Sequence, residues 1–167
     1  IPLRPDDKSS ENNYTNADPK GPTNCLGNKH GETEVERNKN RTEIVDPERM
    51  IRFGSSDFEQ AVRFYQGSKG QITEQDFVLG SIDQLHRLGV HSSAYQEAVE
   101  TMGDLTTAIC LLIIDANMTR NSNPVQNPGG MLRAMTRQHK AGRLNLVGSL
   151  IGLDQKQNEK SNRGSCE

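Results

Sequence analysis

The uneven distribution of large apolar side chains constrains the fold of this chain more than any other feature. Such side chains are almost absent from Ile1 to about Thr42, where Asn, Lys, Glu, Pro and Gly dominate, and they recur at helical spacing after Val45. A segment this polar cannot bury enough apolar surface to offset the chain entropy that folding would cost. We therefore expect a disordered polar linker over residues 1–45, a folded domain over residues 46–153 and a flexible tail over residues 154–167.

Two helices are predicted in the first half of the expected domain, each with a start and a stop signal. The first begins behind Ser56 as N-cap and ends at Gly67 to Gly70. The second begins after Thr73, which can form a capping box with Asp76, and ends at Gly89. The apolar stripe of this second helix consists of Phe77, Val78, Ile82, Leu85 and Leu88.

Further helical patterns follow up to Leu153. A third helix is predicted from about Ser92 to Gly103, and a fourth opens at Asp104 with the most apolar stretch of the chain. Apolar residues cover most of the fourth helix, which predicts that it forms the centre of the core. A fifth helix over Met131–Lys140 and a last apolar segment over Leu144–Leu153 complete the domain. The expected fold is all-α with about five to six helices, and a helix-turn-helix or winged-helix-like arrangement is one form that it could take.

Catalytic and metal-binding patterns are absent from the sequence. The three cysteines are far apart and none belongs to a zinc or redox spacing, while His86, His91 and His139 have no spaced Cys or carboxylate partners. Walker loops, dinucleotide-binding glycine patterns and nucleophile elbows are also missing. We predict a non-enzymatic protein without metal or cofactor. With no apolar run long enough to span a membrane, a cytoplasmic location with reduced thiols is expected.

Charge gives the clearest sign of a binding surface. The net charge is -2, but every charged residue between Asn117 and Asn145 is a cation. Arg133, Arg137 and Lys140 lie at i, i+4 and i+7, which places them on one face of the fifth helix. This predicts a basic stripe that contacts phosphates, with an ordinary solvated face as the alternative. The candidate DNA-binding residues are Arg120, Asn127, Gly129, Gly130, Arg133, Arg137, Lys140 and Arg143.

The segment Asn127-Pro128-Gly129-Gly130 has the composition of a helix start. Asn is a favourable N-cap and Pro a favourable first helical residue, and the glycines leave the following N–H groups unshielded. A phosphate could bind there with help from the helix dipole. The alternative is that the glycines only let two helices pack closely.

The segment from Leu85 to Glu100 has the pattern of a helix-turn-helix corner. A recognition helix needs cations near phosphate, whereas its predicted surface offers Gln96, Glu97 and Glu100. We therefore do not expect the main DNA contact on this helix.

Two blocks of sequence resemble the C-terminal domain of plasmid replication initiation protein C, the RepC initiator of repABC-type replicons in alphaproteobacteria. They are LHRLGVHSSAYQEAVETMG, from Leu85 to Gly103, and NPGGMLRAMTRQHKAGRLNLVGSL, from Asn127 to Leu150. The resemblance implies a two-domain initiator whose winged-helix-like N-terminal domain binds the origin and is joined to this domain by a variable polar linker. Together with Ile1 in the first position, it leads us to expect that the chain is part of a longer protein.

Three functions follow from these observations. The first is non-enzymatic support of replication initiation by binding plasmid origin DNA, other replication proteins or both. The second is a protein-interaction or self-association module, with the apolar last segment and the acidic third helix as its surfaces. The third and weaker one is a helix-turn-helix transcription regulator.

Overall fold

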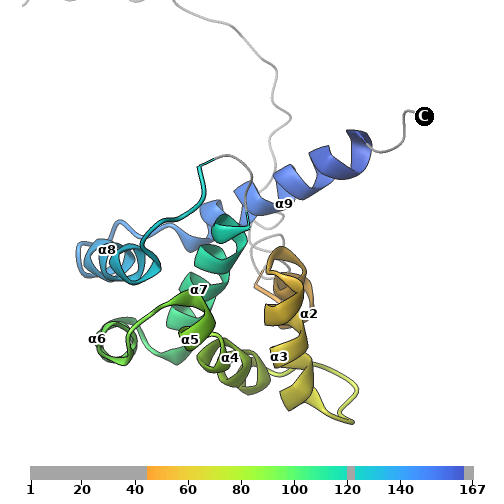
Figure 1. Cartoon of the computed structure of the whole chain (residues 1–167), viewed down its shortest axis with the longest axis horizontal. Coiled ribbons are helices and arrows are strands. Elements are labelled where there is room, and N and C mark those ends of the chain that lie inside the picture. Colours follow the sequence, from red (N-terminus) through yellow and green to blue (C-terminus); the bar gives the residue numbers. More distant parts are fainter. Residues whose placement is uncertain (1–44, 120–122, 164–167) are drawn as a thin grey trace, which may run out of the picture. The chain divides into compact units, whose positions relative to one another are not determined.

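The structure, a computed structural model, describes residues 45–119 and 123–163, with the side chain of Arg163 left out. Every regular element in these two ranges is a helix, so the predicted all-α fold is confirmed (Figure 1). The predicted linker lies almost wholly outside the described residues, as does Arg120. The order of elements is α2 (Pro47–Met50), the 3-10 helix η1 (Ile51–Phe53), α3 (Ser56–Gln66), α4 (Glu74–Asp83), α5 (Leu85–Leu88), α6 (Ser92–Met102), α7 (Asp104–Met118), α8 (Pro128–Lys140) and α9 (Leu146–Arg163).

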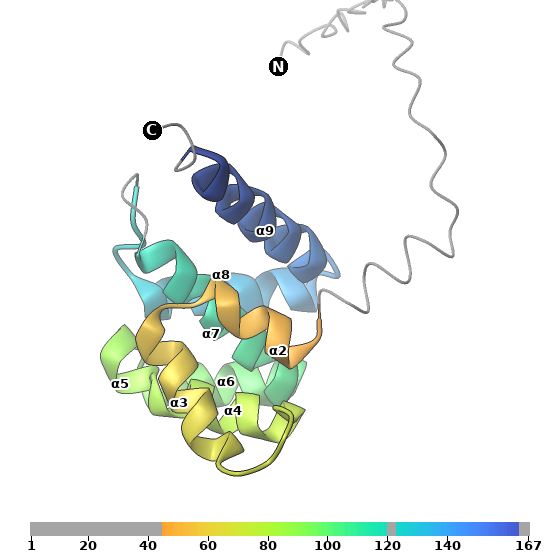
Figure 2. The ribbon, with the colours of Figure 1, turned by 90° about the vertical axis from the view of Figure 1, so that its right-hand side faces the viewer.

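Helix α7 forms the centre of the core, as the sequence predicts. Every residue from Thr107 to Ala116 is buried, and α4, α6, α8 and α9 all contact this helix (Figures 1 and 2). Leu111, Leu112 and Ile114 have no exposed surface, and the burial of each such side chain stabilises the fold by about 1.5–3 kcal/mol. A helix that is apolar on all sides has to be surrounded in this way.

Helices α3 and α4 form a closely packed pair (Figure 2). The rings of Phe58 and Phe77 meet between them with centroids 5.8 Å apart. Gly80 lies so close to α3 that a Cβ atom there would be 2.6 Å from the Cα atom of Val62. The absence of a side chain at Gly80 therefore sets the distance between the two helix backbones.

The predicted N-cap of the first helix is off by one residue. The hydroxyl of Ser55 accepts the N–H of Phe58, and Ser55 has the extended backbone of a capping residue, with φ -69° and ψ 165°. Ser56 is already the first residue of α3. A serine in either position fits the sequence pattern, and the backbone conformation decides between them.

The predicted capping box at the start of the second helix is confirmed. The Thr73 hydroxyl accepts the N–H of Asp76, and the Asp76 carboxylate accepts the N–H of Thr73 at 3.0 Å. The Lys69 ammonium, 2.7 Å from the same carboxylate, together with these Thr73 hydrogen bonds, lowers the pKa of Asp76 to about 2. Since this value lies below the ordinary range, the stabilisation is present above about pH 4 and is lost as the pH falls toward 2.

The second helix was predicted to continue to Gly89, and this prediction is wrong. It ends at Asp83, and α5 follows as a separate short helix. At the break the N–H of Gln84 donates to the carbonyl of Ser81, three residues earlier, and the Ser81 hydroxyl donates to Val78. Such i→i+3 bonds and side-chain bonds to the backbone tighten the turn and end the regular α-helical ladder. Gly89, with φ 69°, then leads into α6 and completes the predicted corner.

Two elements at the start of the domain were not predicted. Helix α2 and the 3-10 helix η1 bury Met50, Ile51 and Phe53. The pair Asp46-Pro47 was an available signal, because Pro favours the first turn of a helix. These elements and the break after Asp83 explain why the described residues form more helices than the five or six expected.

Helix α9 extends past Leu153, where the sequence analysis places the end of the domain. Leu150 and Leu153 are buried, whereas Gln155 to Asn162 are exposed. The last turns of α9 project beyond the other helices in Figures 1 and 2, and Gln157 contacts η1. The flexibility of residues 154–167 stays a prediction. Within the described ranges no helix is long and apolar enough to cross a membrane.

Candidate nucleic-acid interface

The start of α8 is capped by Asn127, as predicted. Its Oδ1 atom accepts the N–H of Gly130 at 2.8 Å, and Pro128 is the first helical residue. This bond occupies one of the N–H groups that the sequence analysis left free for a phosphate. The helix start therefore offers fewer free N–H groups to an anion than its sequence suggests.

The two glycines at this helix start do not mark a close approach of two helices. A Cβ atom on Gly130 would lie 2.8 Å from the Nδ2 atom of Asn127, so glycine at this position makes room for the cap itself. A Cβ atom on Gly129 would meet only the Asn127 side chain and the carbonyl of Gly89, at 3.9 and 4.0 Å, which are ordinary contacts.

The structure places Arg133, Arg137 and Lys140 together on the exposed face of α8, and we call this set the basic stripe. Leu132 and Met135 on the other side of the helix are buried. The last turn of α8 carries Arg137 and Lys140, where cations are favoured by the helix dipole. The helical spacing in the sequence predicted this arrangement correctly.

Arg133 differs from the other two cations because it interacts with α6. Its Nε atom lies 4.0 Å from Oε2 of Glu97, and a terminal nitrogen of its guanidinium lies 3.5 Å from the hydroxyl of Ser93. Both partners of the ion pair are about half exposed, at 48% each. Glu97 therefore neutralises part of the charge at this end of the stripe.

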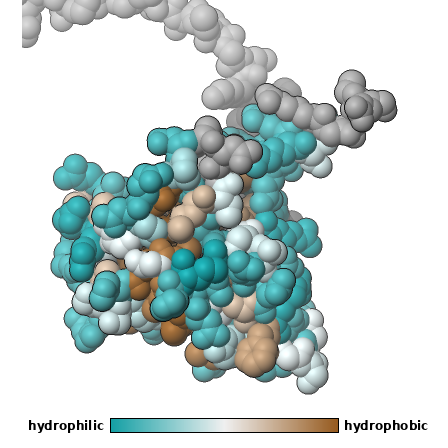
Figure 3. All heavy atoms as spheres, viewed as in Figure 1, coloured by the Kyte–Doolittle hydropathy of each residue, from teal (hydrophilic) through white to brown (hydrophobic). Residues whose placement is uncertain are grey.

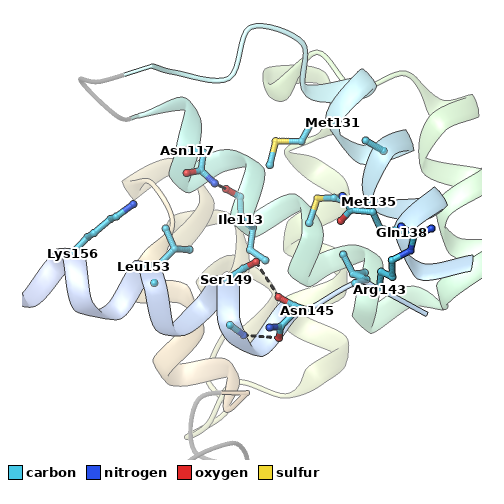
Figure 4. A pocket seen from close by; sticks show the side chains of 14 residues that line it. Ile113, Asn117, Met131, Met135, Gln138, Arg143, Asn145, Ser149, Leu153 and Lys156 are labelled. Atoms are coloured by element: carbon cyan, nitrogen blue, oxygen red, sulfur yellow. Dashed lines mark hydrogen bonds between the residues drawn. The ribbon is translucent and has the colours of Figure 1, made fainter. Parts of the chain in front are cut away.

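The remaining candidate residues lie elsewhere. Asn127, Gly129 and Gly130 are at the opposite end of α8 from Lys140. Arg143 follows α8 and lines a groove of about 510 Å³ between α7, α8 and α9 (Figure 4). This groove was not predicted from the sequence, because its walls come from three different helices that meet only in the folded chain.

A buried charge that the sequence analysis did not single out connects α3, α5 and α7. The Asp115 carboxylate, with no exposed surface, accepts hydrogen bonds from the N–H of Ser55 at 2.6 Å and from its hydroxyl at 3.0 Å. The guanidinium of Arg87 donates to Asp115 and, at 3.1 Å, to the Ser55 hydroxyl. A lone carboxylate in the apolar part of α7 was the available signal, because buried charges are almost always paired. This network is well explained as support for the fold.

Among the described residues, no three His, Cys, Asp or Glu side chains are grouped as metal ligands would be. Cys110 lies in the core, where burial raises the pKa of its thiol to about 12. A thiol with this pKa stays protonated at neutral pH and is a poor nucleophile. The predicted lack of a cofactor or metal stays a prediction.

Comparison with known proteins supports the resemblance seen in the sequence. Residues 60–156 match the family model described as the replication protein C C-terminal region. A protein of Rhizobium rhizogenes named "Putative replication protein C" is 31% identical over 88 residues, which cover 52% of this chain and 21% of that protein. The chain thus aligns with about a fifth of this relative's length. No solved structure matches the chain. Since the family model covers more than half of the chain, the protein belongs to the replication protein C C-terminal region family.

Proposed function

We propose that this domain supports plasmid replication initiation without enzymatic chemistry, by holding DNA through the basic stripe of α8. The observation that carries the proposal is the exposed face formed by Arg133, Arg137 and Lys140 on a helix that contains no Asp or Glu. At about 1.5 Å per residue the three side chains span about 10 Å. That length is enough to meet two or three successive phosphates of one strand, which are about 3.4 Å apart along the duplex axis.

Contacts of this kind give affinity and orientation but no sequence preference, because phosphates are the same at every base pair. The origin sequence would be read by the N-terminal domain that the family resemblance implies. The basic stripe would then hold the neighbouring DNA, and plasmid origin DNA is the proposed partner.

The test is the salt dependence of DNA binding by the full chain. Replacing Arg133, Arg137 and Lys140 by Gln should flatten the plot of log affinity against log salt by about two to three units, at about 0.9 per lost contact. Three full contacts would give about 2.7 units, and the change is smaller because Glu97 neutralises part of the charge on Arg133. Origin and scrambled DNA should be affected alike.

A control variant removes the same number of cations from other exposed positions, namely Arg52, Arg63 and Lys160. It should leave the slope unchanged. An equal decrease of the slope in both variants would mean that only net charge matters. The proposal would be contradicted if the unaltered chain did not bind DNA at low salt.

A second candidate function is binding of another replication protein or of a second copy. The groove between α7, α8 and α9 favours the binding of a protein, and it lies outside the basic stripe. No specific observation favours a transcription regulator.

A further inference from the structure

The groove between α7, α8 and α9 has an apolar floor and small side chains on one wall. Met131, Ala134 and Met135 line it from α8, and Gly148, Ser149 and Gly152 line it from α9 (Figure 4). Ile113 and Leu153 at its base belong to the buried core. Around α7, hydrophobic residues also come to the surface of the face shown in Figure 3.

The α9 wall fits the approach of another helix backbone. Gly148 and Gly152 are four residues apart and lie on the same side of α9. Gly148 has a local explanation, because its N–H donates to Oδ1 of Asn145 at 2.9 Å and a Cβ atom would displace that cap. A Cβ atom on Gly152 would meet nothing within 4 Å. Glycine inside a helix is unfavourable, and at Gly152 it keeps this wall of the groove free of a side chain.

The opposite wall, which comes from α8, can contact apolar partners of different shapes. Met131, which is half-buried, and Met135, which is largely buried, line the groove from α8 (Figure 4). Methionine side chains are unbranched and polarizable, and they are common on surfaces that adapt to different helical ligands. An amphipathic helix that lays its apolar face into a groove is a recurring mode of peptide recognition.

The charged residues that line the groove indicate which kind of helix would bind there. Its two ionisable lining residues are Arg143 and Lys156, both exposed cations, and no carboxylate lines it. Figure 4 shows them at opposite ends of the groove. A ligand with carboxylates beside its apolar face would pair with both.

We propose that this groove binds an acidic amphipathic helix of a partner protein. Helix α6 of a second copy is a poorer fit, because its apolar residues Ala94, Ala98 and Met102 are buried in its own core and its carboxylates Glu97 and Glu100 are exposed on the other side. The proposal does not depend on DNA binding, since the basic stripe is on another face of α8.

The experiment selects peptides from a displayed library of helix-forming sequences on the full chain and measures their affinity by fluorescence polarisation. The selected peptides should carry Asp or Glu next to apolar residues at i, i+3, i+4 and i+7. Gly152→Leu should weaken their binding at least tenfold, because the new side chain would occupy the groove at a position where a Cβ atom meets nothing within 4 Å. Gln155→Leu adds the same side chain to α9 outside the groove and should leave the affinity unchanged.

Charge reversal provides the second comparison. Arg143→Glu with Lys156→Glu should abolish binding of the selected peptides, whereas Arg137→Glu with Lys140→Glu should not. Gly152→Leu should also leave DNA binding intact, which separates a failure of this proposal from a failure of the proposed function. Lack of any enriched peptide, binders without carboxylates, or equal binding to Gly152→Leu would overturn the proposal. Concentration-dependent dimerisation that Gly152→Leu abolishes would overturn it in favour of a second copy.

Discussion

At the scale of single residues, one buried charge connects three helices. Asp115 has no exposed surface and accepts hydrogen bonds from Ser55 and Arg87. Among the described residues that are not exposed, no fully buried side-chain nitrogen or oxygen lacks a partner. An ionised carboxylate is costly to bury, so the benefit of Asp115 is the joining of three helices at one point.

Asp115→Ala should therefore destabilise the domain strongly. The change leaves the Ser55 N–H and the Arg87 guanidinium without their acceptor, and breaking a buried ion pair costs about 3–5 kcal/mol. We expect the lower end of this range, because the Arg87 side chain is 33% exposed and water can solvate it. Urea denaturation of the full chain measures the difference in free energy of unfolding.

Asp57→Ala is the matched control. Asp57 lies 3.9 Å from the same guanidinium but its side chain is 61% exposed, so its removal should cost less than about 1 kcal/mol. A similar decrease in the free energy of unfolding in the two variants would show that the burial of Asp115 is not the cause of the destabilisation.

At the scale of helices, packing distance and capping are set by glycines with different roles. Gly80 lets α4 approach the backbone of α3, Gly130 and Gly148 make room for asparagine caps, and Gly152 faces open space. Sequence alone gives all four the same appearance, that of a glycine within or near a helix.

The same substitution at two of these glycines should have opposite effects. Gly80→Ala should destabilise the domain by about 3 kcal/mol, the upper part of the usual range for overpacking, because the new Cβ atom would meet the Val62 backbone at 2.6 Å. Gly152→Ala should stabilise it by up to about 1 kcal/mol, since alanine favours a helix and nothing obstructs it. Thermal and urea denaturation would reveal the signs, and destabilisation by both variants would contradict this account.

At the scale of the whole molecule, the described helices share one hydrophobic core that runs from Met50 to Leu153. Helix α2 and η1 close it on one side, where the Gln157 side chain of α9 donates to the carbonyl of Arg52 at 2.6 Å. The core is therefore completed by residues that begin just after the predicted linker.

Removal of residues 1–44 should leave the melting temperature unchanged, because these residues belong to the predicted polar linker, and the buried core residues of the described part begin at Met50. Removal of residues 1–53 should unfold the domain. It deletes Met50, Ile51 and Phe53, each worth about 1.5–3 kcal/mol when buried, and their sum is comparable to the whole stability of a small domain. Circular dichroism during heating distinguishes the two variants. Loss of structure in the shorter deletion would place part of the folded domain within the predicted linker.

Local sequence patterns predicted the helical class, the central position of α7 and the common face of Arg133, Arg137 and Lys140. These features depend on residue periodicity and on capping, which act over a few neighbouring positions. Only the folded chain shows the pairing of Asp115 with Arg87, the approach of Gly80 to Val62, and the groove between α7, α8 and α9. Each of these joins residues that are distant along the chain, and local patterns carry no information about which distant surfaces will meet.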